Sequence, residues 1–178
     1  ECSHIEVSGD YIYVLGGGFD DAIAVIDISD EDHWQELHQF ETLSDENDQL
    51  SVSGDLLLHA VSRDPRIDIY SIADPKMPVL ISSLPLPHQA TRMVVKDSVV
   101  FIGTKQGHGV RVIDIANPAN PIEAGVVWDG STVDHLTVIG SRLYTVRGGN
   151  RVDQLDVSDL EQFELLTTQY FDFAGMIE

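Results

Sequence analysis

One motif recurs four times along the chain and restricts its possible folds more than any other sequence feature. Each copy is an apolar run that closes on a short polar residue. The closing residues are Asp27, Ser71, Asp114 and Asp156, so the steps between copies are 44, 43 and 42 residues. A regular step of this size indicates a tandem array of one supersecondary unit, in which each unit buries apolar surface against its neighbours.

Two further features keep the same period. A tight turn followed by an apolar strand recurs at 8–10, 53–55, 95–97 and 139–141. A bulky or rigid side chain recurs later in each copy, at Trp34, Pro78, Pro121 and Phe163. Three registers that share one period identify a genuine internal repeat.

The content of each repeat predicts its structure. In the third copy, β-branched and apolar runs at 91–95, 99–103, 109–115 and 122–128 are separated by Gly, Asp, Asn and Pro, which is typical of short strands joined by turns. Four strands in a period of about 40–50 residues are the signature of a propeller blade. We therefore predict an all-β fold, a β-propeller of four-stranded blades at 4–43, 45–87, 88–130 and 131–173, within one domain over 1–178.

The repeat resembles that of LVIVD-repeat β-propellers. The resemblance is carried by segment 23–30, which reads IAVIDISD, and by segment 110–121, which reads VRVIDIANPANP. The first and fourth copies lack the Asn-Pro pair of that pattern. Because this family is a recurrent surface or secreted module of bacteria and archaea without a single established activity, the resemblance implies an extracellular or cell-surface location, with the periplasm as an alternative.

The two ends of the chain suggest an incomplete ring. Segment 4–7 opens the first repeat, and segment 176–178 looks like the same strand opening a fifth. Propellers have about four to eight blades. We therefore expect the four repeats to belong to a larger ring, completed by further sequence or by another copy of the chain in a homo-oligomer.

Charge excludes several classes of partner. The chain has 30 acidic and 10 basic residues, a net charge of −20 and a pI near 4.3. Such an acidic protein is unsuited to nucleic acid or to an anionic membrane surface, both of which require Lys and Arg. No apolar stretch is long enough to span a bilayer, so membrane insertion is not expected.

Loops between the second and third strands of the blades supply the candidate ligand face. Its residues are Arg63, Lys105, His108, Arg147 and Arg151, with Asp20 in the corresponding loop of the first repeat. Loops on a rigid scaffold are frequent binding sites. A locally basic set within an acidic chain favours an anionic ligand, and we expect a protein or glycan partner.

A second candidate set opens the first strand of each repeat. These polar residues are His4, Gln49, Thr91 and His135, and they would line the central channel. Two imidazoles could ligate a metal, but no column of carboxylates accompanies them. We expect a polar, hydrated channel with no metal or other cofactor, and a divalent cation such as calcium is the alternative.

The sequence contains none of the catalytic motifs searched for, and we assign no catalytic residue. There is no G-x-S-x-G elbow and no H-E-x-x-H helix. The leading functional hypothesis is a non-enzymatic module that binds a protein, a glycan or a cell-surface component. The alternative is a hydrolase or lactonase of the propeller type, with a divalent metal in the channel.

Overall fold

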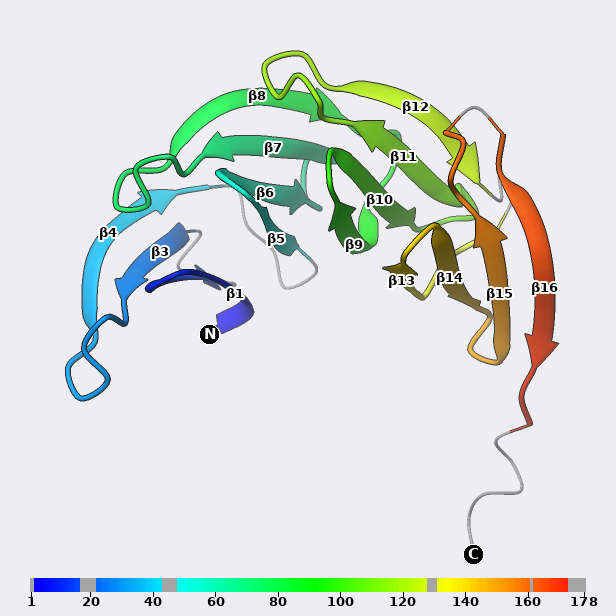
Figure 1. Ribbon diagram of the computed structural model, residues 1–178, viewed down its shortest axis with the longest axis horizontal. Helices are drawn as coiled ribbons and strands as arrows, with labels where there is room; N and C mark the ends of the chain where they lie inside the picture. The colour runs from blue at the N-terminus through cyan, green and yellow to red at the C-terminus, as the bar shows by residue number, and fades with distance from the viewer. Residues whose placement is uncertain (1, 17–21, 43–47, 128–130, 161, 173–178) are drawn as a thin grey trace, which may run out of the picture. The chain divides into compact units, whose positions relative to one another are not determined.

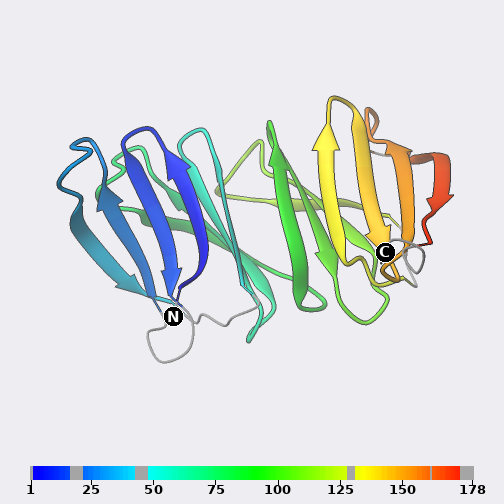
Figure 2. The ribbon, with the colours of Figure 1, turned by 90° about the horizontal axis from the view of Figure 1, so that it is seen from below.

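The chain folds into β-sheets, as the repeat predicts. The computed structural model describes residues 2–16, 22–42, 48–127, 131–160 and 162–172. Within these residues, four antiparallel sheets contain four strands each, and every sheet keeps its strands in chain order (Figure 1). Neighbouring strands of a sheet alternate in direction (Figure 2).

The strands have the following bounds. The first sheet contains β1 (Cys2–Ser8), β2 (Tyr11–Gly16), β3 (Ala22–Asp27) and β4 (Gln35–Glu41). The second contains β5 (Gln49–Ser53), β6 (Leu56–Val61), β7 (Arg66–Ser71) and β8 (Val79–Pro85). The third contains β9 (Ala90–Lys96), β10 (Val99–Thr104), β11 (Val110–Asp114) and β12 (Ile122–Val127). The fourth contains β13 (His135–Ile139), β14 (Arg142–Arg147), β15 (Arg151–Asp156) and β16 (Glu164–Tyr170).

These sheets are the blades of the predicted propeller class, so the all-β prediction is confirmed. The four strands predicted for the third repeat correspond to β9–β12 within one or two residues, and Trp128 lies outside the described residues. The single domain stays a prediction. The segment 176–178, on which the expectation of a fifth repeat rests, lies outside the described residues.

A left-handed residue forms the turn between the first two strands of every blade. Gly9, Gly54 and Gly140 have φ of 56°, 56° and 58°, and Asp97 takes the same position in the third blade with φ of 54°. The repeat pattern predicted this turn at 95–97, with Lys96 at the position of the glycine. That register is wrong by one residue, because Asp97 takes the position of the glycine. Aspartate is among the few residues that adopt this backbone conformation at small cost.

The closing polar residue caps a turn in the first, second and fourth repeats. The carboxylate of Asp27 accepts a hydrogen bond from the backbone N–H of Ser29 at 2.9 Å, and Asp156 accepts one from Ser158 at 2.8 Å. Such Asx turns end a strand by giving its next backbone donor a side-chain acceptor. Asp27 and Asp156 therefore stabilise the chain reversal that ends the third strand of their blades, and Asp156 also pairs with Arg142.

A β-bulge recurs between the third and fourth strands of each blade. The register shifts after Val25, Ile69, Val112 and Gln154 in the four blades. A bulge lets residues an odd number apart on one strand face the same side of the sheet. The repeat therefore includes a backbone irregularity as well as a sequence pattern.

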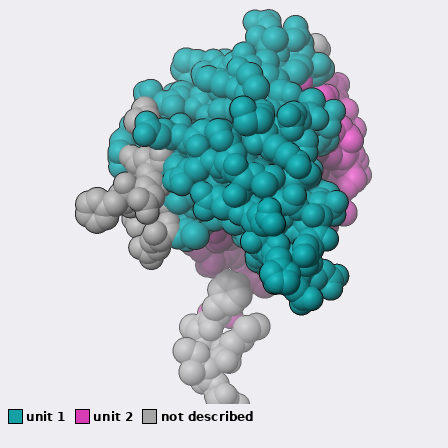
Figure 3. All heavy atoms as spheres, turned by 90° about the vertical axis from the view of Figure 1, so that its left-hand side faces the viewer, with its two compact units in different colours: residues 1–90, 116–121 teal, residues 91–115, 122–178 magenta. Residues whose placement is uncertain are grey.

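The chain divides into two compact units, coloured separately in Figure 3. Unit 1 comprises residues 1–90 and 116–121, and unit 2 comprises 91–115 and 122–178. Unit 1 buries a core between its two blades, formed by Tyr13, Leu15, Ile23, Val25, Leu50, Leu57, Tyr70 and Ile72. Unit 2 buries another, formed by Phe101, Val110, Val112, Val127, Val133, Leu143, Leu155 and Val157.

Both cores consist of alternate residues of adjacent strands, so each blade contributes one apolar face to a shared interior. Within the described part of the chain, no helix has the length and apolar character needed to cross a membrane.

Candidate functional site

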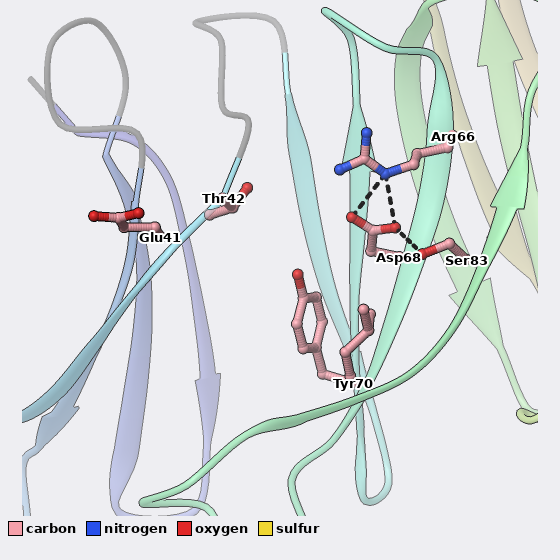
Figure 4. A pocket seen from close by; sticks show the side chains of 7 residues that line it. Glu41, Thr42, Arg66, Asp68, Tyr70 and Ser83 are labelled. Carbon is pink, nitrogen blue, oxygen red and sulfur yellow. Dashed lines mark hydrogen bonds and ion pairs between the residues drawn. The ribbon is translucent and has the colours of Figure 1, made fainter.

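A polar pocket of about 370 Å³ lies in unit 1, between the end of the first blade and the outer strands of the second. It is lined by Glu41, Thr42, Arg66, Asp68, Tyr70, Leu80 and Ser83 (Figure 4). Its volume falls within the range of small-molecule sites, about 300–1,000 Å³. Its lining combines carboxylates, hydroxyls, a guanidinium and an aromatic ring.

Strand periodicity places three of these side chains together. Arg66, Asp68 and Tyr70 alternate along β7 and share one face, while Ile67 and Ile69 face the other way into the protein interior. On β8, Ser83 pairs with Asp68 and Leu80 pairs with Tyr70, on either side of the bulge. The bulge thus brings two β8 residues an odd number apart to the same pocket wall.

The buried carboxylate of Asp68 forms part of the pocket wall. Arg66 donates from Nε to both oxygens of Asp68 at 2.9 and 3.0 Å, and from Nη1 to Asp64 at 2.9 Å. The Ser83 hydroxyl also donates to Asp68. The hydrogen bond to Asp68 raises the pKa of Arg66, which keeps the guanidinium charged. We call Arg66, Asp68 and Ser83 the unit 1 brace.

Tyr70 supplies an aromatic wall. Burial, and secondarily the charge of Asp68, raises the pKa of its hydroxyl to about 12, so the group stays neutral. Its ring packs against Phe40, with ring centroids 5.3 Å apart. The hydroxyl points toward the pocket in Figure 4. The ring is therefore fixed by packing, while its polar atom is available to the pocket.

Thr42 begins a chain of buried hydrogen bonds behind the pocket. Its Oγ1 lies 3.3 Å from Nδ1 of His59, and Nε2 of His59 lies 2.9 Å from Oδ2 of Asp48. The other oxygen of Asp48 accepts the backbone N–H of Ser62 at 2.7 Å. His59 and Asp48 are completely buried, so this network satisfies groups that would be costly to leave unpaired.

The order threonine, histidine, carboxylate resembles the residue types of a nucleophilic triad. A catalytic histidine must also deliver its proton to the leaving group. The ring of His59 is 0 % exposed and both its nitrogens are engaged within the protein. This series of hydrogen bonds can orient the Thr42 hydroxyl, but it does not give His59 access to a substrate.

Unit 2 contains an equivalent of the brace. Arg151 donates from Nε to Asp153 at 2.9 Å, and the Thr168 hydroxyl donates to the same oxygen. Arg147 adds a second cation, 2.7 Å from the other oxygen of Asp153. Burial by itself would raise the pKa of Asp153, but hydrogen bonds from Thr168, Arg147 and Arg151 outweigh burial and lower it. We call Arg147, Arg151, Asp153 and Thr168 the unit 2 brace.

A pocket of about 180 Å³ in unit 2 has only apolar side chains in its described lining. It is lined by Val126, Val127, Leu155, Phe163 and Leu165. By strand pairing, Leu155 is the equivalent of Tyr70 and Leu165 is the equivalent of Leu80. The two pockets therefore occupy related grooves, each between the fourth strand of one blade and the outer strands of the next.

The predicted ligand-face residues are divided between the units. Arg63 is exposed in the β6–β7 turn of unit 1, whereas the other four belong to unit 2. There, His108 forms a backbone bridge with Ser131, and Nη1 of Arg147 donates to the Ser131 hydroxyl at 2.9 Å. Ser131 thus brings the loop of Lys105 and His108 next to Arg147.

Arg147 and Arg151 differ from the exposed loop residues that the sequence suggested. Both are bonded to Asp153, and Arg147 is 8 % exposed. A role of either in contacting a ligand stays a prediction, since no observation tests it. Asp20 lies outside the described residues.

The predicted channel residues lie on the first strands of the blades. In unit 1, His4 contacts Glu6 at 3.7 Å, and Gln49 donates to the carbonyl of Asp48 at 2.9 Å. In unit 2, Thr91 donates to the carbonyl of Val133 at 2.6 Å, and His135 accepts from Nε of Arg92 at 3.2 Å.

These contacts are made within each unit. Among the described residues, no group of three or more His, Cys, Asp or Glu side chains is placed to hold a metal ion.

The pocket residues Glu41, Thr42 and Tyr70 were not among the sequence candidates. Their convergence depends on packing of two blades, which a single repeat does not reveal. One local signal was present: Arg66-Ile67-Asp68 and Arg151-Val152-Asp153 share an Arg-x-Asp spacing that puts both charges on one strand face. That spacing identifies the braces, though not the pocket.

Four-stranded antiparallel blades with repeated turns and bulges define the protein as one of the β-propeller class. The model of the LVIVD repeat family matches residues 1–42 and 89–129, which include the first and third blades. The chain therefore contains LVIVD repeats in these two segments, as its sequence resemblance indicated. A search of curated protein sequences found no match.

Solved structures support the same fold. A functionally unknown protein from Desulfotomaculum acetoxidans aligns with 96 % of this chain and 56 % of its own, at 16 % identity and a TM-score of 0.80. A putative 6-phosphogluconolactonase from Bacteroides fragilis aligns over 96 % of this chain and 57 % of its own, at 14 % identity and a TM-score of 0.73. The computationally designed protein Ika8 aligns over 95 % of this chain and 49 % of its own, at 18 % identity and a TM-score of 0.69.

This chain thus spans about half the length of these three proteins. At such identities the similarity establishes the fold alone.

Proposed function

We propose that this LVIVD-repeat protein is a non-enzymatic binding module, and that the pocket of unit 1 holds a glycan of a cell-surface or extracellular component. The observation that carries the proposal is the set of polar side chains around one aromatic ring in a 370 Å³ pocket. Ligand sites commonly combine an apolar wall with a few well-placed polar groups. Sugars present hydroxyls at their edges and C–H groups on their faces, which matches this composition.

The chemistry of the pocket supports binding more than reaction. Arg66 and Asp68 neutralise each other, and the hydroxyl of Tyr70 is neutral. His59, the one imidazole linked to the pocket lining, is enclosed. The side chains that face the ligand can form hydrogen bonds, and their contacts with other residues of the protein hold them in place.

Calorimetric titration against a panel of monosaccharides and disaccharides tests this function. Wild-type protein should bind at least one sugar, and Tyr70→Leu should weaken that affinity at least tenfold, because it removes the aromatic wall. Leucine is the residue at the equivalent position 155, so the change suits the fold. Tyr170→Leu is the matched control, since Tyr170 is exposed on β16 in unit 2.

Two results would overturn the proposal. One is a wild-type protein that binds no member of the panel. The other is a Tyr70→Leu variant with unchanged sugar affinity, which would move the binding site elsewhere.

Three further parts of the proposal concern the whole protein. We propose that it works without a cofactor, that it acts outside the cytoplasm, and that copies associate to complete a larger ring. Thermal unfolding with calcium, zinc or manganese tests the first, because a bound metal stabilises the folded state. Fractionation of the source cells tests the second, and light scattering over a concentration series tests the third.

A further inference from the structure

The first blade (β1–β4) has one sheet face inside the unit 1 core and one face that points away from it. Four residues of β2 and β3 are completely buried in that core: Tyr13, Leu15, Ile23 and Val25. Because side chains alternate along a strand, the residues between them form the other face. Strand pairing places six apolar residues next to one another there: Ile5, Val7, Ile12, Val14, Ala24 and Ile26. We call these six residues the first-blade end face.

The first-blade end face is apolar and partly open to solvent. Ile5 is 58 % exposed and Val7 is 56 % exposed. A terminal unit of a repeat array needs a polar outer face to stay soluble, whereas this face consists of apolar side chains. A contiguous apolar surface on a chain with a net charge of −20 indicates an interaction site.

The other blades show what covers this face of the repeat. The residues that correspond to Ile5, Ile12 and Ile26 are Leu50, Leu57 and Tyr70 in the second blade and Leu136, Leu143 and Leu155 in the fourth. They pack in the cores of unit 1 and unit 2, against the opposite face of the preceding blade. The natural cover of the first-blade end face is therefore the opposite face of another blade.

The first blade also lacks the charges that this face holds elsewhere. Each brace contains an arginine and an aspartate two residues apart on the third strand of its blade. The first blade has Ala22 and Ala24 at these positions. Covering the face on β1–β3 therefore removes no charged group from water, which would be costly.

The fourth blade presents the opposite face of the repeat. Leu143 and Leu155 belong to the unit 2 core, so the alternate residues of β14 and β15 point away from it. Strand pairing places four partly exposed residues together on that side: Tyr144, Val146, Val152 and Gln154. We call them the fourth-blade end face. Their counterparts in the first blade are the four residues buried in the unit 1 core.

We propose that the fourth-blade end face of one copy docks on the first-blade end face of a second copy. The contact repeats, between chains, the packing that each unit contains between its own blades. This inference rests on the association of copies proposed above and is independent of sugar binding. Two copies of four blades make eight, within the range of about four to eight known for propellers, so we expect a pair of chains.

Tyr144 supplies a polar contact at this interface. In unit 1, the hydroxyl of its counterpart Tyr13 donates to the carbonyl of Pro75 at 3.3 Å, in the β7–β8 turn of the next blade. The hydroxyl of Tyr144 therefore reaches the corresponding β3–β4 turn of the second copy. That bond fixes the register of the two sheets, while the apolar residues around it are buried.

Two glutamines make the contact weaker than those inside the units. Gln154 and Gln169 take the positions of Val25 and Phe40, which lie in and beside the unit 1 core. An amide that leaves water without a partner opposes burial. We therefore expect the pair to dissociate on dilution, and Gln154→Val should strengthen it.

Light scattering over a concentration series of the full chain tests the contact. The wild-type mass should rise toward twice the 19.6 kDa of one chain. Val7→Lys should raise the dissociation constant about tenfold or more, because it places a charge in the apolar face. Val79→Lys is the matched control, since Val79 is 62 % exposed on β8 and lies outside both end faces.

Two variants of the fourth blade test the other side. Gln154→Val should lower the dissociation constant about threefold or more, and Val146→Lys should raise it about tenfold, by the same balance of apolar and polar burial. A mixture of Val7→Lys and Val146→Lys chains keeps one unaltered pair of faces. Mixed pairs should therefore form at concentrations where neither variant pairs with itself.

Each other result overturns the contact in a distinct way. A wild-type mass of one chain at every concentration would overturn both the contact and the association of copies. A pair that Val7→Lys weakens and both fourth-blade variants leave unchanged would assign the association to two first-blade faces. Equal effects of Val7→Lys and Val79→Lys would assign it to net charge. Sugar titration is a separate measurement, so the binding function and this contact fail independently.

Discussion

The two units contain related inter-blade grooves lined by different side chains. In unit 1, Tyr70 and Leu80 belong to a pocket of about 370 Å³ that also has charged and hydroxyl side chains in its lining. In unit 2, their equivalents Leu155 and Leu165 belong to a pocket of about 180 Å³ whose lining side chains are all apolar. Both grooves lie next to a brace in which an arginine and a hydroxyl share one buried aspartate.

This comparison separates architecture from specialisation. A feature that appears in both units, such as the Arg-x-Asp brace and the bulge, serves the blade itself. A feature that differs, such as tyrosine against leucine, is free to vary without loss of the fold. The polar lining of unit 1 is therefore the better candidate for function, and the following variants test the division.

The largest expected effect separates the two braces. Asp153→Ala removes the buried carboxylate that pairs with both Arg147 and Arg151, and removing one partner of a buried ion pair costs about 3–5 kcal/mol. Asp68→Ala should cost less, about 1–3 kcal/mol, because Arg66 is more exposed and keeps Asp64. Urea unfolding of both variants measures the difference. Equal losses would show that Arg147 adds nothing to the unit 2 brace.

The next effect concerns packing specific to unit 2. A Cβ at Gly125 would lie 2.8 Å from the ring of Phe163, so Gly125→Ala should destabilise the protein by about 1–3 kcal/mol. The position in unit 1 that is equivalent to Gly125 by strand pairing is His38. Adding Phe163→Leu to Gly125→Ala should recover part of the loss in thermal unfolding, because it opens space for the methyl group. A double variant that shows simple additivity would contradict this contact.

A smaller effect tests the turns shared by all blades. Gly9→Ala should cost about 1 kcal/mol, since its φ is 56° and no atom within 4 Å would meet the new methyl group. Asp97→Gly should change stability by less than about 0.5 kcal/mol, because aspartate already tolerates the conformation and glycine adds unfolded-state entropy. A loss of more than 1 kcal/mol in Asp97→Gly, measured by urea unfolding, would show that the Asp97 side chain has its own stabilising role.

The smallest effect is a dependence on pH. Hydrogen bonds from Ser158, and then the nearby Arg142, lower the pKa of Asp156 to about 2. A lowered carboxyl pKa contributes stability above its ordinary value of about 3.9, and this contribution is lost as pH falls toward 2. Asp156→Ser, which copies Ser71 of the second blade, should flatten the decline in the urea midpoint between pH 4 and pH 2. An unchanged slope would exclude Asp156 as its source.

Much of the fold was predictable because its determinants are local and repeated. Strands, turns and the closing Asp column depend on residues close together in sequence, so four copies reinforce one pattern. The register error at Asp97 arose where a non-glycine residue takes a glycine position. Trp34, Leu37 and Phe40 have a spacing that would suit a helix, but a repeat of four strands requires a strand here, and β4 begins directly after Trp34.

The candidate site was less predictable because its determinants are not local. Arg147 looked like an exposed loop cation, but its partner Asp153 lies across the β14–β15 hairpin. The pocket requires Thr42 after one blade and Tyr70 within the next, and no periodic pattern relates them. The structure has Arg63 in a turn, but it has Arg147 and Arg151 at the ends of β14 and β15, and the direction of these side chains could not be predicted from the sequence.

The bond between Thr42 and His59 has a consequence for cooperativity. It joins the segment that follows β4 to β6 of the next blade, so it acts across a boundary between repeats. In a linear array, the coupling between nearest neighbours decides whether repeats melt together or separately. A ligand seated against Thr42 and Tyr70 would contribute to that coupling, and occupancy of the pocket would make the two blades of unit 1 melt as one.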